Sequence, residues 1–173
     1  MLYTTQEAWE DRLLQLANKP FNEALISTFN LYLGSPKVEE ALVKLNASGK
    51  AKVLVGVPNY SPCCEWKEGP CPPCTKNRAR LLDRITQATV KYPKIQWNYT
   101  YDWHLKTYMF RIGNLWVGLF GGVNLSASSW TDALIDLYGK DAKELVGIVK
   151  ERLDTSPLIT KEALAIDGYR KRA

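Results

Sequence analysis

The sequence predicts an α/β fold in which helices cover both faces of a mixed β-sheet. Apolar runs at 24–34 and 51–58 enclose a helix-like segment, and this strand–helix–strand order is typical of a parallel crossover. Two further runs, 104–112 and 115–121, flank the pair Gly113-Asn114, which favours a hairpin and therefore antiparallel strands. The 173 residues are expected to form one domain with both kinds of strand pairing.

Three helices are predicted before the hairpin. The first covers 4–18, because Thr4 and Glu7 have the spacing of a capping box. The second follows the cap Ser35-Pro36 and ends at Gly49, with Val38, Ala41, Leu42 and Leu45 on its apolar face. The third covers 78–92, and a strand at 94–99 follows it.

The chain after the hairpin is predicted from shorter signals. Segment 122–130 is expected to be a loop, and 132–139 a short helix that Gly139 ends. Segment 144–149 is a short apolar run, which predicts a buried strand. The remainder, 150–173, is expected to be helical.

Composition excludes several classes of protein. Hydrophobic residues make up 46% and charged residues 24%, a balance typical of a folded globular chain. No apolar run approaches the roughly 20 residues that a membrane span needs, and the N-terminal segment lacks the apolar stretch of a signal peptide. A cytoplasmic protein without membrane contact is therefore expected. The net charge of +5 allows an acidic partner but does not demand one.

Two short motifs contain the candidate catalytic residues. His104 is the only histidine in the chain, and His104 and Lys106 lie two apart on a predicted strand, so that both side chains are expected on one face. The next strand leads into Gly121-Gly122-Val123-Asn124, where the glycines permit a tight turn directly before a polar residue. Alone, a His-x-Lys pair indicates a core histidine more often than a site. The second motif favours a site.

These two motifs resemble those of the phospholipase D superfamily, in which His-x-Lys is followed by an aspartate and then by a Gly-Ser-x-Asn turn. The stretch GGVNLS is similar to the form found in the nuclease branch, and the resemblance extends over about 24–150. Two positions depart from the pattern. Arg111 stands where the family has the aspartate, and Gly122 stands where it has serine.

The resemblance implies metal-independent hydrolysis of a phosphodiester. In such a site His104 attacks phosphorus and forms a phosphohistidine, while Lys106 and Asn124 stabilise the phosphate oxygens. Gly122 and Ser126 would help to hold the substrate. A carboxylate usually orients the histidine, and Glu144 is the first candidate, with Asp132 and Asp136 as alternatives. A second imidazole must protonate the leaving oxygen, and since each chain has one histidine, a homodimer is implied.

Nucleic acid is the expected substrate. Basic residues share one face of the predicted helix 78–92 and its approach, and they indicate either a solvated surface or a groove for a polyanion: Lys76, Arg80, Arg84 and Lys91. Arg111 is a further candidate for phosphate contact. The alternating aromatic residues before His104 are either a packed sheet face or a platform for stacking bases: Trp97, Tyr99, Tyr101 and Trp103.

The loop predicted at 59–77 contains all four cysteines, Cys63, Cys64, Cys71 and Cys74. The C-x-x-C pair favours a structural zinc site, although adjacent cysteines are an awkward spacing for metal ligands. An iron–sulfur cluster, redox thiols and unliganded cysteines remain alternatives. Two other functions also stay open: a zinc-stabilised nucleic-acid-binding protein with weakened or lost catalysis, and a phospholipase or transferase.

Overall fold

The described residues form a seven-stranded mixed sheet in the order β1-β7-β6-β5-β2-β3-β4. The computed structural model describes residues 1–29, 31, 33–57, 72–101, 103–122, 125 and 133–160, without the side chains of 72–79. The strands are β1 (Leu2–Tyr3), β2 (Glu23–Thr28), β3 (Ala51–Val57), β4 (Gln96–Tyr101), β5 (Lys106–Ile112), β6 (Leu115–Gly121) and β7 (Leu134–Tyr138). The helices are α1 (Gln6–Ala17), α2 (Pro36–Ser48), α3 (Pro72–Lys91) and α4 (Gly139–Thr155).

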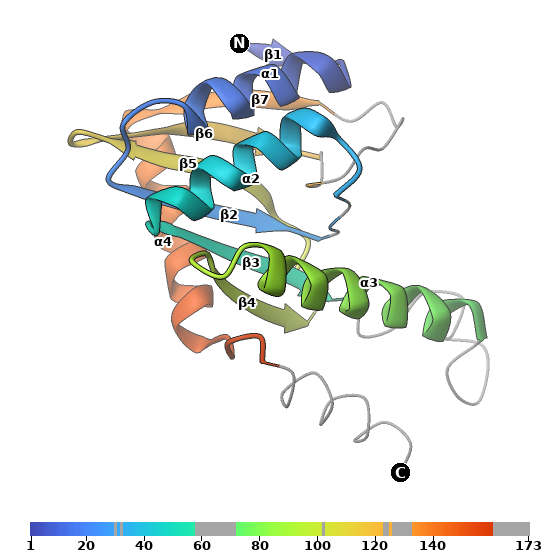
Figure 1. The fold of residues 1–173 in the computed structure, drawn as a ribbon. Helices are drawn as coiled ribbons and strands as arrows, with labels where there is room; N and C mark the ends of the chain where they lie inside the picture. The colour runs from blue at the N-terminus through green and yellow to red at the C-terminus, as the bar shows by residue number, and fades with distance from the viewer. Residues whose placement is uncertain are drawn as a thin grey trace.

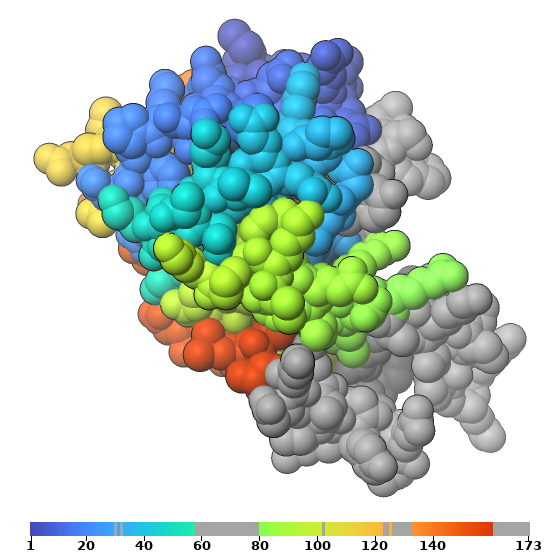
Figure 2. Space-filling view, viewed as in Figure 1, coloured from blue at the N-terminus to red at the C-terminus, as the bar shows by residue number. Residues whose placement is uncertain are grey.

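Helices cover both faces of the sheet, as the sequence predicts. Strand alternation divides the core, so that Ile26 joins the residues beneath α1, α2 and α3, whereas Leu25 joins those beneath α4. Figure 1 shows α1, α2 and α3 in front of the sheet and α4 behind it. The same three helices lie side by side in the space-filling view of Figure 2 and close the front face. The result is a three-layer α/β architecture.

The two halves of the sheet pair differently. Strand β2 is parallel to β3, and β3 is parallel to β4, whereas β5, β6 and β7 continue the sheet from β2 in antiparallel steps. Because β5 alone reverses direction between β2 and β6, its first residue lies at the edge where both neighbours end. The expected mixed sheet is therefore confirmed, and one edge gathers the ends of several strands.

Local signals fix the helix ends. The Ser35 hydroxyl accepts a hydrogen bond from the Val38 backbone N–H, and Gly49 ends α2 in the left-handed conformation with φ of 62°. The first helix is capped by Thr5, whose hydroxyl accepts from the Ala8 N–H, so the predicted capping box at Thr4 is wrong by one residue. The hairpin at Gly113-Asn114 is confirmed, with Gly113 at φ of 59°.

Two predicted elements after the hairpin are wrong in type. Segment 132–139, predicted as a helix, contains β7, because Leu134 to Tyr138 pair with β6 along their whole length. Segment 144–149, predicted as a strand, lies inside α4. There the buried residues Ala142, Val146, Val149 and Leu153 recur at helical intervals that a six-residue window does not reveal.

Other boundaries differ by several residues. Strand β2 ends at Thr28 rather than continuing to 34, and β5 begins at Lys106, so His104 precedes the strand. Helix α4 ends at Thr155, after which Leu158 forms an isolated bridge with Asn98 of β4. The rest of the predicted C-terminal helix, 161–173, lies outside the described residues. In the part of the chain that the structure describes, no helix is both long and apolar enough to cross a membrane.

Two glycines allow a matched test of this packing. A Cβ at Gly118 would collide with the Tyr108 carbonyl oxygen and lie 2.8 Å from the Met109 Cα, whereas a Cβ at Gly147 meets nothing within 4 Å. Gly118→Ala should lower the free energy of unfolding by about 1–3 kcal/mol, because β5 cannot move away from β6 without breaking the sheet. Gly147→Ala, on the exposed side of α4, should raise it by about 0.5–1 kcal/mol. Urea denaturation measures both, and equal effects would contradict the register of β5 on β6.

Candidate active site

The candidate site lies at the sheet edge where β2 and β6 end and β5 begins. Lys106, the first residue of β5, pairs with Gly121, the last residue of β6. On its other side β5 pairs with β2, so that Thr107 lies opposite Ser27. The carboxyl end of β3, which is parallel to β2, reaches the same edge. The ends of three strands, β2, β3 and β6, therefore lie at the edge where β5 starts.

His104 and Lys106 are in direct contact. The His104 Nδ1 and the Lys106 Nζ are 2.8 Å apart. The Lys106 side chain is buried, with 7% of its surface exposed, whereas His104 is exposed. A lysine ammonium only donates hydrogen bonds, so Nδ1 accepts, and a neutral ring in this arrangement carries its proton on Nε2. The predicted His-x-Lys pair therefore comes together, although His104 lies outside the strand.

The environment of His104 favours the neutral ring. Burial of part of the imidazole and the positive charge of Lys106 both lower the pKa of His104 below its ordinary value. The Phe29 ring contributes to this burial, since its centroid lies 3.9 Å from that of the imidazole. A lowered pKa keeps the lone pair of a ring nitrogen available near neutral pH. The geometry thus offers a neutral imidazole beside a fixed positive charge.

The second motif begins at the same edge. The Gly122 N–H donates to the Ala133 carbonyl oxygen at 3.1 Å, and Gly121 has no room for a Cβ against that carbonyl. Leu125 is buried, forms a bridge with Leu31, and donates its N–H to the Thr28 hydroxyl at 2.9 Å. Gly122 and Leu125 are therefore held at the edge that carries Lys106. Asn124 and Ser126, both predicted site residues, lie outside the described residues.

The residues on either side of His104 are fixed by polar contacts. The Trp103 indole N–H donates to the Ser27 hydroxyl at 2.5 Å, and that hydroxyl donates to the Leu105 carbonyl oxygen at 2.5 Å. Gly56 of β3 provides the space, because a Cβ there would collide with the Trp103 carbonyl. No local sequence pattern marks Ser27 or Gly56 for these contacts.

Arg111, predicted to contact substrate, does not lie at this edge. It is five residues along β5 from Lys106, a distance of roughly 17 Å at the usual rise of a strand. There it pairs with the first residue of β2, Glu23, whose carboxylate is 3.6 Å from the Arg111 Nε. The direction of β5 therefore carries Arg111 to the edge of the sheet opposite Lys106, and its contact with substrate stays a prediction.

Glu144, predicted to orient the histidine, is also misplaced. It lies on α4 rather than on a strand, its side chain is 67% exposed, and it pairs with Lys140 of its own helix at 3.7 Å. The structure does not bring it to His104. Of the alternatives, Asp132 lies outside the described residues. It immediately precedes Ala133, whose carbonyl accepts from Gly122.

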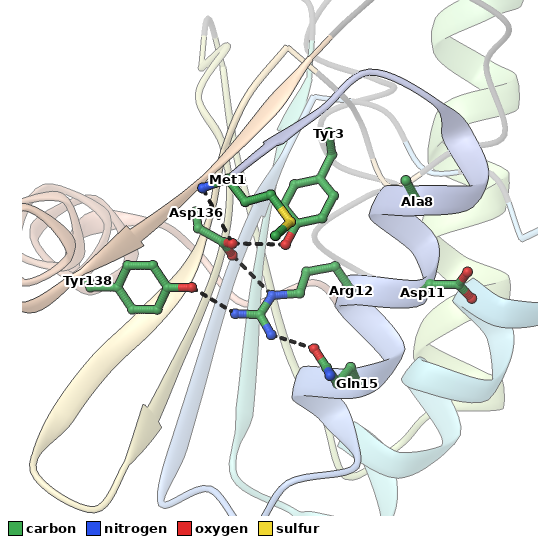
Figure 3. A pocket seen from close by; sticks show the side chains of 8 residues that line it. All are labelled: Met1, Tyr3, Ala8, Asp11, Arg12, Gln15, Asp136 and Tyr138. Atoms are coloured by element: carbon green, nitrogen blue, oxygen red, sulfur yellow. Dashed lines mark hydrogen bonds and ion pairs between the residues drawn. The ribbon is translucent and has the colours of Figure 1, made fainter.

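Asp136, the other alternative, belongs to a separate network beside a shallow pocket of about 450 Å³ between α1, β1 and β7. Its carboxylate accepts hydrogen bonds from the Tyr3 hydroxyl at 2.8 Å and from the Arg12 Nε at 3.0 Å (Figure 3). Burial opposes ionisation, but these hydrogen bonds outweigh it and lower the pKa of Asp136. Burial and the bond to Asp136 raise the pKa of Tyr3 to about 12. Asp136 thus joins β7 to α1 and does not orient His104.

The residues predicted to contact nucleic acid are the basic residues of α3 and the aromatic residues before His104. On α3, Arg80 is exposed and Arg84 is half-buried, and the side chain of Lys91 pairs with Glu39 at 2.7 Å. Of the aromatic residues, Trp97 and Tyr99 are buried in the core beneath the front helices, so they cannot stack on bases. Tyr101 and Trp103 are half-buried.

The cysteine prediction falls largely on residues that the structure leaves undescribed. Cys63, Cys64 and Cys71 lie outside the described residues, and Cys74 is described only as backbone in the first turn of α3. Among the described residues no group of histidine, cysteine and acidic side chains is arranged to hold a metal ion.

Comparison with solved structures identifies the fold as phospholipase D-like. NucT from Helicobacter pylori superposes with a TM-score of 0.61 at 9% identity over 92% of this chain and 98% of its own. Polyphosphate kinase from Porphyromonas gingivalis superposes with a TM-score of 0.58 at 19% identity over 91% of this chain. The archaeal chromatin protein TrmBL2, whose structure shows a novel mode of DNA binding, superposes with a TM-score of 0.56 at 10% identity over 92% of this chain. The chain spans only 26% of that kinase and 54% of TrmBL2. No family model and no curated protein sequence matches the chain.

The charge of Lys106 can be tested through His104. Lys106→Met should raise the pKa of His104, because removing the adjacent cation makes the imidazolium less unfavourable. Nuclear magnetic resonance titration reports this pKa without ambiguity, since the chain has one histidine. Lys44→Met, at an exposed position of α2, is the control and should leave the titration unchanged. A pKa of His104 that falls or stays constant in Lys106→Met would contradict the observed contact.

Proposed function

We propose that the chain is a metal-independent phosphodiesterase, an endonuclease that cleaves DNA or RNA through a phosphohistidine in a homodimeric active site. The observation that carries the proposal is the His104–Lys106 contact at the sheet edge where the Gly121-Gly122 turn begins. The phospholipase D-like fold supports it. So does the lowered pKa of His104, since a nucleophilic imidazole must be neutral.

The reaction follows from these groups. The Nε2 of one His104 forms a bond to phosphorus while the bond to the leaving oxygen breaks, and the imidazolium of a second His104 gives that oxygen its proton. Water then attacks the phosphohistidine, gives its proton to the second imidazole, and releases the new phosphate end. Lys106 and Asn124 stabilise the charge on the non-bridging oxygens. No catalytic metal is needed, because these side chains supply the positive potential.

The resting contact has to change for this attack. Lys106 donates to Nδ1 in the free site, which leaves the ring proton on Nε2. A bound phosphate competes for the Lys106 ammonium, and the freed Nδ1 can then carry the proton while Nε2 turns its lone pair to phosphorus. A carboxylate would stabilise that tautomer. Asp132 is the remaining candidate for this role.

Nucleic acid is the proposed substrate because of the charge on the chain and the exposed Arg80, which together with Arg84 would contact a phosphate backbone. The DNA binding of TrmBL2, a protein of similar fold, agrees with this choice. Structural zinc at Cys63, Cys64, Cys71 and Cys74 is proposed to stabilise the loop that leads into α3, so that zinc acts in folding and not in the reaction.

A nucleic-acid-binding protein with weakened or lost catalysis is the second candidate. Gly122 in place of serine favours it, because the hydroxyl that would help to hold phosphate is missing. The resemblance to TrmBL2 favours it as well. A turnover assay on plasmid and on single-stranded DNA separates binding from cleavage. A phospholipase or transferase is the third candidate, and headgroup release from liposomes is its test.

The first test concerns the nucleophile. His104→Ala should abolish cleavage, because the chain has no other histidine, while the binding of the same DNA stays within about threefold of wild type since the phosphate contacts remain. Cleavage by the wild type should persist in EDTA as long as circular dichroism shows that the protein stays folded. Cleavage that requires added magnesium and survives His104→Ala would remove the proposal.

The second test concerns the dimer. Wild-type chains mixed with an excess of His104→Ala chains should form heterodimers of very low activity, because each heterodimer has only one imidazole and the reaction needs two. Lys44→Met chains, with an intact site, are the control and should not lower the activity of the mixture. A fully active monomer in sedimentation at the assay concentration would contradict the two-histidine mechanism.

A further inference from the structure

The last residue of β2, Thr28, and the residue that follows it, Phe29, contact both halves of the candidate site. No motif in the sequence marks them. We propose that they are positioning residues: Thr28 holds the backbone at Leu125, directly after Asn124, and Phe29 holds the ring of His104. This inference rests on the proposed function and names the residues that would set the geometry of its site.

Thr28 is fully buried, and its hydroxyl contacts two distant segments of the chain. The oxygen accepts a hydrogen bond from the Leu125 N–H at 2.9 Å, and the side chain is also hydrogen-bonded to the Tyr108 hydroxyl. Tyr108 is itself buried and stacks on Trp9 of α1 with ring centroids 5.9 Å apart. Because Tyr108 is fixed in the core, it orients the Thr28 hydroxyl, and the hydroxyl in turn fixes the position of Leu125.

Phe29 contacts the other half of the site. Its ring centroid is 3.9 Å from that of His104, with the planes inclined at 37°, and the Lys106 Nζ lies 5.7 Å from the same ring. His104 is exposed and precedes the strand, so its own backbone pairing does not hold the imidazole in place. Phe29 therefore restricts the rotation of the ring and covers one face of it. Gly56 leaves room for this, because a Cβ there would approach the Phe29 ring to 3.2 Å.

The two contacts would act on catalysis differently. Thr28 reaches the site through the backbone of Leu125, so its loss should misplace the phosphate-binding turn and lower kcat. Phe29 shields the imidazole from water, so its loss should also change the protonation of His104. These are effects of position, because neither side chain carries a group that the reaction consumes.

Thr28→Val removes the hydroxyl at constant volume and should lower kcat about 10- to 100-fold on bis(p-nitrophenyl) phosphate, with KM changed by less than about threefold, because a misplaced group loses its effect in the transition state. The amide of Leu125 should exchange its hydrogen faster. Thr28→Ser should restore kcat and the exchange rate of the Leu125 amide.

Thr107→Val is the matched control, since the Thr107 hydroxyl is buried without a hydrogen-bond partner among the described residues. If Thr28→Val does not fold, Thr28→Ala replaces it. Wild-type kcat in the hydroxyl-free variant would overturn the role of Thr28.

Phe29→Leu should raise the pKa of His104 toward its ordinary value, because it uncovers one face of the imidazolium. The acid limb of the pH profile of kcat should move to higher pH by the same amount. Phe29→Tyr keeps the ring and should restore the wild-type titration, and Phe29→Met is the second variant should Phe29→Leu not fold. Phe21→Leu, in the core against Phe110, is the matched control and should lower stability without moving the titration. An unchanged pKa of His104 in Phe29→Leu would overturn the role of Phe29.

The two hypotheses fail separately. The histidine titration and the Leu125 amide exchange are measured without turnover, so they test the contacts even in an inactive protein. A wild-type chain that cleaves no phosphodiester would refute the proposed function. Active wild type with unaltered kinetics and titration in the Thr28 and Phe29 variants would refute only the positioning role.

Discussion

The insertion of β5 between β2 and β6 is the constraint on which the site depends. Because β5 is antiparallel to both neighbours, its first residue, Lys106, is placed where β2 and β6 end. Contacts of the candidate site run between the strands that meet here, from Lys106 to Gly121 and from Thr28 to Leu125. A shift of one residue in either register would turn Lys106 to the opposite face of the sheet. The glycine at 118 supports the register by allowing β5 to approach β6 closely.

The electrostatics of the site follow from the burial that this junction creates. A lysine with 7% of its surface exposed, placed 2.8 Å from an imidazole, makes a second positive charge unfavourable. The neutral ring is therefore favoured in the free site, and the positive charge of Lys106 remains available to an anion. That combination suits an attack on a phosphodiester, where the nucleophile must be uncharged and the phosphate oxygens must be neutralised. The exposed position of His104 leaves it accessible to a large substrate.

Features with local causes could be predicted from the sequence. The cap at Ser35, the stop at Gly49, the Gly113-Asn114 turn and the His104–Lys106 pair all depend on neighbours within a few residues. The short apolar segments at 132–139 and 144–149 predict a helix and a strand, whereas the structure has a strand in the first and a helix in the second. In the first, pairing with β6 decided the structure, and in the second, a helical face longer than the segment itself did.

The residues proposed to position the site act through contacts between distant segments, which no local sequence pattern marks. Thr28 ends an ordinary apolar strand and Phe29 follows it, and their contacts with Leu125 and His104 arise only once β2 lies against the start of β5. The same non-local geometry displaced two predicted residues. Strand direction carries Arg111 to the opposite edge, and the helical course of α4 places Glu144 on an exposed surface.

The covalent bond that His104 is proposed to form to phosphorus can be tested by trapping the intermediate. A labelled oligonucleotide is mixed with excess wild-type protein, quenched within milliseconds in alkaline denaturant, where phosphohistidine persists, and analysed by peptide mass spectrometry. The mechanism predicts a nucleotide adduct on the peptide that contains His104, formed and lost at rates compatible with turnover. Cleavage that proceeds without an adduct, or with an adduct on another side chain, would contradict it.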